Sequence, residues 1–253
     1  MDKDIKKIFV HGWATDSRVW SGLIEEGDIT VELPSHGPNI GMATEGSTPD
    51  ITPATSAIKA ALSHLPEGEE VVAIGWSLGA KALMSLAAES PERLRALVLV
   101  GASPSFIKRE GFPHGLSKAL VRRMLIDFKG SPEETLKRFY RLNFTSTELE
   151  SKEARAFLEL YETTPADFDL KGIATALQSL IKVDIRAKLD KIKIPTLLIH
   201  GDRDEVTPVE AADYLCAKLK DAELVKFPGA GHAPFITEPE KFTDAVREFL
   251  KRI

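Results

Sequence analysis

The sequence predicts an α/β fold, in which a mostly parallel sheet is flanked by helices. Short apolar runs recur along the chain, and they are continuous rather than alternating, as expected of strands covered on both faces. Helical patterns lie between most of these runs, and such alternation favours a parallel sheet with right-handed crossovers. A serine between two glycines stands at one strand-to-helix junction. The predicted strands are residues 8–10, 29–33, 71–74, 97–100, 196–199 and 224–227.

Apolar stripes at helical spacing predict the helices of this alternation. A first helical stretch, residues 82–88, follows the third strand. We expect Thr207 and Thr237 to cap two further helices, because each has a proline nearby and a glutamate three residues later. The stripes are Ile58, Ala61, Leu62 and Leu65, then Val209, Ala212, Leu215 and Leu219, and finally Phe242, Val246, Phe249 and Leu250.

The alternation breaks between about residues 106 and 184, where the patterns are helical only. Ser131 is expected to cap one of these helices. An all-helical block between two strands of a parallel sheet is most simply a lid inserted over the carboxyl edge of the sheet, where ligands bind. We therefore predict a core formed by residues 1–105 and 185–253, and a lid formed by residues 106–184. The stripes are Leu116, Leu120 and Met124; Leu136, Phe139 and Tyr140; Ala154, Phe157, Leu158 and Tyr161; and Ile173, Leu177 and Ile181.

Composition narrows the class of protein. The 253 residues, of which 43% are hydrophobic, suffice for a full core. A net charge of −5 argues against general nucleic-acid binding, which needs a basic field. Cys216 is the one cysteine, so no internal disulfide is expected. The first residues resemble neither a signal peptide nor a membrane span, and we expect a cytoplasmic monomer.

Ser77 is the most informative residue. It lies in Gly75-Trp76-Ser77-Leu78-Gly79, directly after an apolar run and directly before a helical stretch. This context predicts a nucleophile elbow, a sharp turn that presents a serine hydroxyl in a cleft. Glycines are expected on both sides because a Cβ there would collide with the neighbouring strand or helix. The helix that follows would point unpaired N–H groups at an oxyanion.

A serine hydroxyl needs an adjacent base, which a carboxylate in turn orients. His232 follows the last predicted strand, and Asp202 and Asp204 follow the strand before it. The order serine, aspartate, histidine is the one that accompanies such an elbow. All three loops are expected to open on one edge of the sheet. Spacing alone does not separate Asp202 from Asp204, so both are candidates for the orienting carboxylate.

The other five of the six histidines have simpler interpretations. His11 follows the first strand and is expected to shape the loop beside the elbow. His200 ends a strand and is expected to be a satisfied, partly buried side chain. We expect His36, His64 and His114 to be surface or loop residues.

These motifs resemble the α/β-hydrolase superfamily over nearly the full length of the core. The resemblance rests on His11-Gly12-Trp13, the elbow, Gly201-Asp202-Arg203-Asp204 and Gly231-His232-Ala233-Pro234-Phe235. It implies an α/β-hydrolase fold in which Ser77, Asp204 and His232 form the catalytic triad. It also implies that the backbone N–H groups of Trp13 and Leu78 form the oxyanion hole.

A closer resemblance is to the carboxylesterases that hydrolyse the methyl ester of a pimeloyl-carrier protein in biotin synthesis. It adds the lid segment Thr135-Leu136-Lys137-Arg138-Phe139 and the return to the core at Val183-Asp184-Ile185-Arg186. It implies that Arg138 and Arg155 meet an acidic acyl carrier protein. The implied substrate-binding residues are Trp13, Ser77, Leu78, Phe139, Tyr140, Arg141, Leu142, Asn143 and His232.

The chain departs from the family pattern in four places, one of which is Glu134, where a further lid arginine would be expected. It starts almost at the His-Gly strand, so the leading antiparallel strands are expected to be reduced or missing. Pro34-Ser35-His36-Gly37 stands in place of the common Pro-Gly-x-Gly turn, and Ala80 follows the elbow in place of a further glycine. The basic residues in the first half of the predicted lid either attract an acidic carrier or form solvated helix faces paired with local glutamates.

The sequence therefore predicts a serine carboxylesterase that hydrolyses carboxylic esters, methyl esters above all, through an acyl-enzyme. No metal or organic cofactor is expected, because no cluster has ligand spacing and no Gly-x-Gly-x-x-Gly opens a helix after the first strand. Two alternatives stay open. One is another reaction on the same fold, by a carbon–carbon bond hydrolase, a thioesterase or a lactonase. The other is a non-catalytic small-molecule binder.

Overall fold

The centre of the structure is a six-stranded sheet whose strands are all parallel in the residues described. The computed structural model describes residues 5–37, 50–163 and 168–253. The strand order is β2-β1-β3-β4-β5-β6. The strands are β1 (Lys7–Val10), β2 (Ile29–Val31), β3 (Val71–Trp76), β4 (Leu94–Val100), β5 (Thr196–Gly201) and β6 (Ala222–Phe227). The predicted parallel α/β architecture is confirmed.

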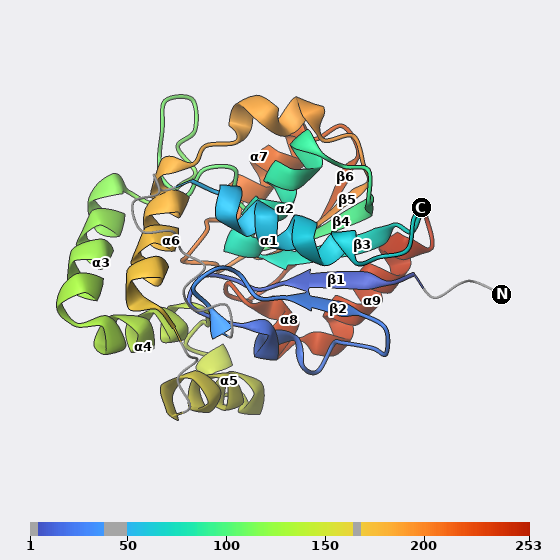
Figure 1. Ribbon diagram of the computed structural model, residues 1–253. Helices are drawn as coiled ribbons and strands as arrows, with labels where there is room; N and C mark the ends of the chain where they lie inside the picture. The colour runs from blue at the N-terminus through green and yellow to red at the C-terminus, as the bar shows by residue number, and fades with distance from the viewer. Residues whose placement is uncertain (1–4, 38–49, 164–167) are drawn as a thin grey trace.

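Burial on both faces explains the continuous apolar runs. Every residue of β3 is buried, and so is every residue of β5. Figure 1 shows α1 and α2 on one face of the sheet and α9 on the other. The core helices are α1 (Thr52–Ser63), α2 (Leu78–Glu89), α7 (Glu210–Lys218), α8 (Pro234–Thr237) and α9 (Pro239–Leu250). Most of the observed strands are longer than the apolar runs that predict them. In β3 the pairing with the neighbouring strand continues into Gly75 and Trp76, and in β5 it continues into His200 and Gly201.

The chain between β4 and β5 is called the helical segment here, and its described residues form four α-helices. Figure 1 places it beyond the carboxyl ends of the strands. Its helices are α3 (Lys118–Gly130), α4 (Pro132–Leu142), α5 (Lys152–Thr163) and α6 (Leu170–Lys182). That residues 106–184 act as a lid stays a prediction. No helix in the described part of the chain is long and apolar enough to cross a membrane.

Two local predictions are wrong. Leu120, expected on the buried stripe of α3, is 56% exposed, and the buried residues of this helix are Val121 and Phe128. A helix that packs along a single narrow face leaves a neighbouring apolar position in solvent, so spacing alone misplaced the stripe by one residue.

The expected hydroxyl caps make no side-chain capping hydrogen bond, although Ser131 is the N-cap residue of α4, as expected. None of α4, α7 and α9 has a side-chain hydrogen bond at its N-cap, and the cap residues of α7 and α9 are Val209 and Glu238. The hydroxyl of Thr237 instead donates to Glu148 Oε1 at 2.7 Å. The hydroxyl of Thr207 is used in the candidate active site, as described below.

Candidate active site

Ser77 stands at a sharp turn between β3 and α2. Its backbone has φ 55° and ψ −108°, a left-handed conformation that costs free energy in a residue with a Cβ. Its N–H donates to the carbonyl of Val100 on the adjacent strand β4 at 2.9 Å. A Cβ on Gly75 would lie 2.7 Å from Leu83 Cδ1 in α2, and one on Gly79 would collide with the carbonyl oxygen of Val10 in β1. The glycines are thus required for the steric reasons that the sequence predicts.

His232 and Asp204 form a fully buried pair. Nδ1 of His232 lies 2.6 Å from Oδ2 of Asp204, and neither side chain is exposed. Because a carboxylate only accepts, Nδ1 carries the proton and Nε2 keeps a free lone pair. Nε2 is buried and has no hydrogen-bond partner among the residues described. The ring therefore has the tautomer that a general base requires.

The His232 ring lies at the carboxyl ends of β3 and β4, the same edge from which Ser77 emerges. A Cβ added to Gly101, directly after β4, would lie 2.6 Å from the ring carbon Cε1. On the other side, Trp76 Nε1 donates to the backbone carbonyl of His232 at 2.9 Å. The rings of Trp76 and His232 have their centroids 5.5 Å apart. Since Trp76 immediately precedes Ser77, the loop that carries His232 lies beside the elbow.

Asp204 is an acceptor for several donors at once. Oδ1 accepts from the N–H groups of Val206 and Thr207, both at 2.8 Å, and the hydroxyl of Thr207 lies 2.9 Å from Oδ2. Burial alone would raise the pKa of Asp204, but His232, His200 and the hydrogen bonds hold it well below its usual range. This carboxylate is therefore ionised beside His232 throughout the physiological range.

Asp202, the other candidate for the orienting role, lies elsewhere. Its carboxylate accepts from the N–H of Gly229 at 2.7 Å, and its side chain is 37% exposed. Thr207, by contrast, belongs to the buried cluster. Its hydroxyl lies 3.0 Å from the carbonyl oxygen of Gly101 and 3.2 Å from Nδ1 of His232. The sequence predicts Thr207 as a helix cap and does not reveal that its hydroxyl lies beside Asp204 and His232. Its spacing of three residues from Asp204 is a signal from which this contact could be predicted.

Leu78 lies at the start of α2 and Trp13 in the loop after β1, and their role as oxyanion donors stays a prediction. Leu78 is the first residue of α2, and the first N–H groups of a helix have no intrahelical partner. Trp13 follows β1, and its side chain is anchored by a hydrogen bond from Nε1 to the carbonyl of Ile173 at 2.8 Å. Its ring lies edge-on to Phe139, with the centroids 4.8 Å apart, and to Phe128. The loop from His11 to Asp16 thus lies between the sheet and the helical segment.

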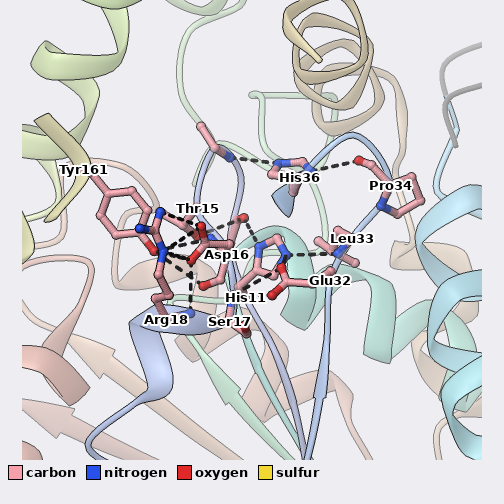
Figure 2. Close-up of polar contacts among 12 residues, drawn as sticks. His11, Thr15, Asp16, Ser17, Arg18, Glu32, Leu33, Pro34, His36 and Tyr161 are labelled. Carbon is pink, nitrogen blue, oxygen red and sulfur yellow. Dashed lines mark hydrogen bonds and ion pairs between the residues drawn. The ribbon is translucent and has the colours of Figure 1, made fainter. Parts of the chain in front are cut away.

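Two buried histidines hold this loop, as Figure 2 shows. Nδ1 of His11 donates to the carbonyl of Gly12 at 2.8 Å, while its Nε2 accepts from the N–H of Leu33 at 3.0 Å. The expectation that His11 shapes the loop agrees with these contacts. His36, expected to be a surface or loop residue, lies in the turn after β2, but its side chain is fully buried. The sequence around His36 indicates a turn, but it does not reveal that this turn packs against the loop from His11 to Asp16.

The predicted substrate residues of α4 fall into two groups. Phe139 contacts Trp13, the hydroxyl of Tyr140 donates to the carbonyl of Ala14 at 2.9 Å, and the carbonyl of Asn143 accepts from the N–H of His232 at 2.8 Å. The other two, Arg141 and Leu142, are exposed. Arg138 and Arg155, expected at a carrier protein, are exposed and pair with Asp127 at 3.5 Å and Glu150 at 2.8 Å.

Glu148 is a further residue at the site that the sequence did not single out. Its Oε2 accepts from the N–H of Gly231 at 2.8 Å, directly before His232, and also from the N–H of Thr145. In the sequence it is one of several lid glutamates and has no distinguishing pattern. Within the described ranges, no group of three or more His, Cys, Asp or Glu side chains is arranged to hold a metal ion.

Comparisons with known proteins bear on the family of this chain. Residues 8–245 match the Alpha/beta hydrolase family. A protein named pimeloyl-[acyl-carrier protein] methyl ester esterase from Nitrosomonas europaea is 33% identical over 244 residues, covering 93% of this chain and 91% of that protein. The protein of the same name from Aromatoleum aromaticum is 33% identical, covering 96% of this chain and 97% of its own length.

Solved structures are similar over almost the whole chain. An esterase from Exiguobacterium antarcticum superposes with a TM-score of 0.85 at 26% identity, covering 99% of this chain and 93% of that one. A bromoperoxidase from Bacillus anthracis superposes with a TM-score of 0.84 at 24% identity, covering 98% and 92% of the two chains. The second likeness bears on the fold alone.

Proposed function

Because the chain belongs to the Alpha/beta hydrolase family, we propose that it is a serine carboxylesterase that removes the methyl group from a carrier-bound pimeloyl methyl ester. The observation that carries the proposal is the buried His232–Asp204 pair, whose unpartnered Nε2 lies at the sheet edge from which Ser77 emerges. The relatives named pimeloyl-[acyl-carrier protein] methyl ester esterase support the choice of substrate.

The reaction follows from the roles of these groups. His232 Nε2 takes the proton of the Ser77 hydroxyl as its oxygen attacks the ester carbonyl carbon. The N–H groups of Leu78 and Trp13 stabilise the resulting oxyanion, each by about 3–4 kcal/mol in comparable sites. His232 returns the proton to the departing methanol and leaves an acyl-enzyme. A water molecule then attacks in the same way, with His232 again the base, and releases the free carboxylic acid.

A small cavity next to the elbow offers room for part of the acyl chain. Its volume is about 50 Å³, and it lies between Leu78, the turn after β2 and helix α6. Its walls are largely apolar, which suits methylene groups. The lining residues include Leu33, Pro34, Ile51, Ala54, Leu78 and Ala176.

The carrier-protein role of Arg138 and Arg155 rests on their exposure and charge. Their side chains are 65% and 64% exposed, and each ion pair that they form is solvated, so either arginine can exchange its partner at little cost. A basic surface of this kind steers an acidic carrier and loses that effect as salt screens it. The helical segment would then serve as a lid that the carrier approaches. The cytoplasmic location and the monomeric state expected from the sequence stay predictions.

The decisive experiment measures ester hydrolysis with and without the carrier. The protein should hydrolyse short p-nitrophenyl esters and methyl pimeloyl-carrier protein, and Ser77→Ala should abolish both activities and labelling by a fluorophosphonate probe. Full activity of Ser77→Ala would refute the proposed nucleophile. Intact hydrolysis of short esters without hydrolysis of the carrier ester, or without rescue of a biotin auxotroph blocked at this step, would refute the substrate only.

A second measurement tests the carrier surface. The double variant Arg138→Ala/Arg155→Ala should lower kcat/KM for the carrier ester and leave short p-nitrophenyl esters unaffected. Lys220→Ala removes an exposed positive charge outside the helical segment and is the matched control. An equal loss on both substrates, or an equal effect of the control, would contradict the assignment.

A further inference from the structure

The peptide between Gly12 and Trp13 is fixed in direction by two hydrogen bonds. The carbonyl oxygen of Gly12 accepts from Nδ1 of His11 at 2.8 Å and from the hydroxyl of Thr15 at 3.1 Å. In a trans peptide the C=O and N–H point in opposite directions. Holding the Gly12 carbonyl therefore also fixes the direction of the Trp13 N–H, the group that the proposed mechanism uses for the oxyanion.

The next residue is held on both of its backbone groups. Ala14 has φ 56°, an unfavourable left-handed conformation that must be maintained by its surroundings. Its N–H donates to Nε2 of His36 at 3.0 Å, and its carbonyl accepts from the hydroxyl of Tyr140 at 2.9 Å. His36 comes from the turn after β2, whereas Tyr140 comes from α4. One of the two restraints is thus supplied by the helical segment.

Asp16 provides a second connection to the helical segment. The hydroxyl of Tyr161, on α5, lies 3.0 Å from Asp16 Oδ1 and 3.3 Å from the Asp16 N–H. The guanidinium of Arg18 binds the same carboxylate and lies 5.3 Å from the centre of the Tyr161 ring (Figure 2). A change in the position of α5 would therefore move the far end of the loop.

Both tyrosine hydroxyls stay protonated and able to donate. Burial raises the pKa of Tyr140 and that of Tyr161 well above the usual range, with the charge of Asp16 adding to it in each case. The pKa of Asp16 lies below its ordinary value, because Arg18 outweighs the effect of burial, so this carboxylate remains an acceptor. The two contacts do not weaken by titration near neutral pH.

We propose that Tyr140 and Tyr161 are positioning residues that hold the loop from His11 to Asp16, so that the helical segment helps to keep the Trp13 N–H in the direction set by the bonds to the Gly12 carbonyl. This inference rests on the proposed function, since it assigns Trp13 to the oxyanion hole. An oxyanion donor acts on the transition state and much less on the ground state. Loss of a positioning hydroxyl therefore lowers kcat and leaves KM nearly unchanged.

The test removes one hydroxyl at a time. The chain has three tyrosines, and Tyr214 on α7, half-buried against Phe112, is the matched control for Tyr140→Phe and Tyr161→Phe. We expect Tyr140→Phe to lower kcat on p-nitrophenyl acetate about tenfold, less than the hundredfold or more that follows removal of an oxyanion donor itself. KM should change less than about twofold. Tyr214→Phe should leave both parameters unchanged.

A trifluoromethyl ketone distinguishes positioning from general destabilisation. Its adduct with a serine carries an oxyanion, so its Ki should weaken in the same proportion as kcat in Tyr140→Phe and Tyr161→Phe. Measurements are made well below each variant's melting temperature. An unchanged kcat with a lowered melting temperature, or a loss confined to KM, would overturn the proposal. Failure of the proposed function appears separately, as full activity of Ser77→Ala.

Discussion

The hydrogen bonds of Asp204 predict the outcome of replacing it by asparagine. Oδ1 accepts from two backbone N–H groups, those of Val206 and Thr207, at 2.8 Å each. In Asp204→Asn the amide oxygen must take this position, because the reverse orientation would place an NH₂ group against both donors. Such a mismatch leaves buried polar groups unsatisfied at about 1–3 kcal/mol each. The amide nitrogen therefore takes the place of Oδ2, 2.6 Å from Nδ1 of His232.

That orientation reverses the proton arrangement of the imidazole. An amide N–H donates, so Nδ1 of His232 must accept, and the ring proton moves to Nε2. A protonated Nε2 cannot take the proton of Ser77. Wrong-tautomer variants of serine hydrolases lose about 10⁴-fold in kcat. At about 1.4 kcal/mol for each tenfold change, the loss corresponds to about 5.5 kcal/mol of transition-state stabilisation.

The assay is the steady-state hydrolysis of p-nitrophenyl acetate, with circular dichroism to verify folding. Asp202→Asn is the control, since its amide oxygen can still accept from Gly229 and the site is partly exposed. We expect the control to keep nearly all activity. Retention of more than a tenth of kcat by Asp204→Asn, or an equal loss in the control, would refute the reasoning.

Three further variants test the packing, a buried charge and the histidine loop. Gly79→Ala forces a Cβ against β1 and should lower the free energy of unfolding by about 1–3 kcal/mol. Gly130→Ala places its Cβ in open space and should not lower the free energy of unfolding. Equal midpoints of urea unfolding for the two variants would contradict this. Burial lowers the pKa of Lys81 from 10.5 to about 7, so the unfolded chain binds more protons between these values and stability rises with pH there. Lys81→Met should remove that rise, of up to about 1.4 kcal/mol per pH unit, and should stabilise more at pH 7 than at pH 10. Glu148→Ala removes the acceptor of the Gly231 N–H and should lower kcat for short esters, and an unchanged kcat would contradict this role.

The sequence predicts the framework of the site well because the framework depends on local rules. A glycine on each side of Ser77 is required by contacts with α2 and β1, and the turn can be recognised from five residues. The placement of His232 after the last strand follows from parallel strands ending at a common edge. The choice between Asp202 and Asp204 required the resemblance or the structure, since two loop carboxylates two residues apart have the same local pattern.

The residues that hold the site could not be predicted, because their contacts join distant parts of the chain. Thr207 fits a helix cap equally well, and its hydroxyl could not be assigned until β4 placed the Gly101 carbonyl beside it. His36 is a turn residue whose burial depends on the loop after β1, which packs over it. Glu148 contacts Gly231, 83 residues later in the chain. Periodicity and motifs carry no information about such pairings.

These distant contacts have a common consequence for how the site can vary. The helical segment supplies the carbonyl of Asn143 to the N–H of His232 and the hydroxyl of Tyr140 to the carbonyl of Ala14. Both contacts come from α4 and its end, the same stretch whose Phe139 packs on Trp13. A substitution that shifts α4 to admit a different acyl chain would therefore also shift His232 and the loop from His11 to Asp16. Changes of specificity in this protein should be tolerated best at Thr175 and Ala176, whose side chains line the cavity, and not at Gly172, where a Cβ would collide with Ser35.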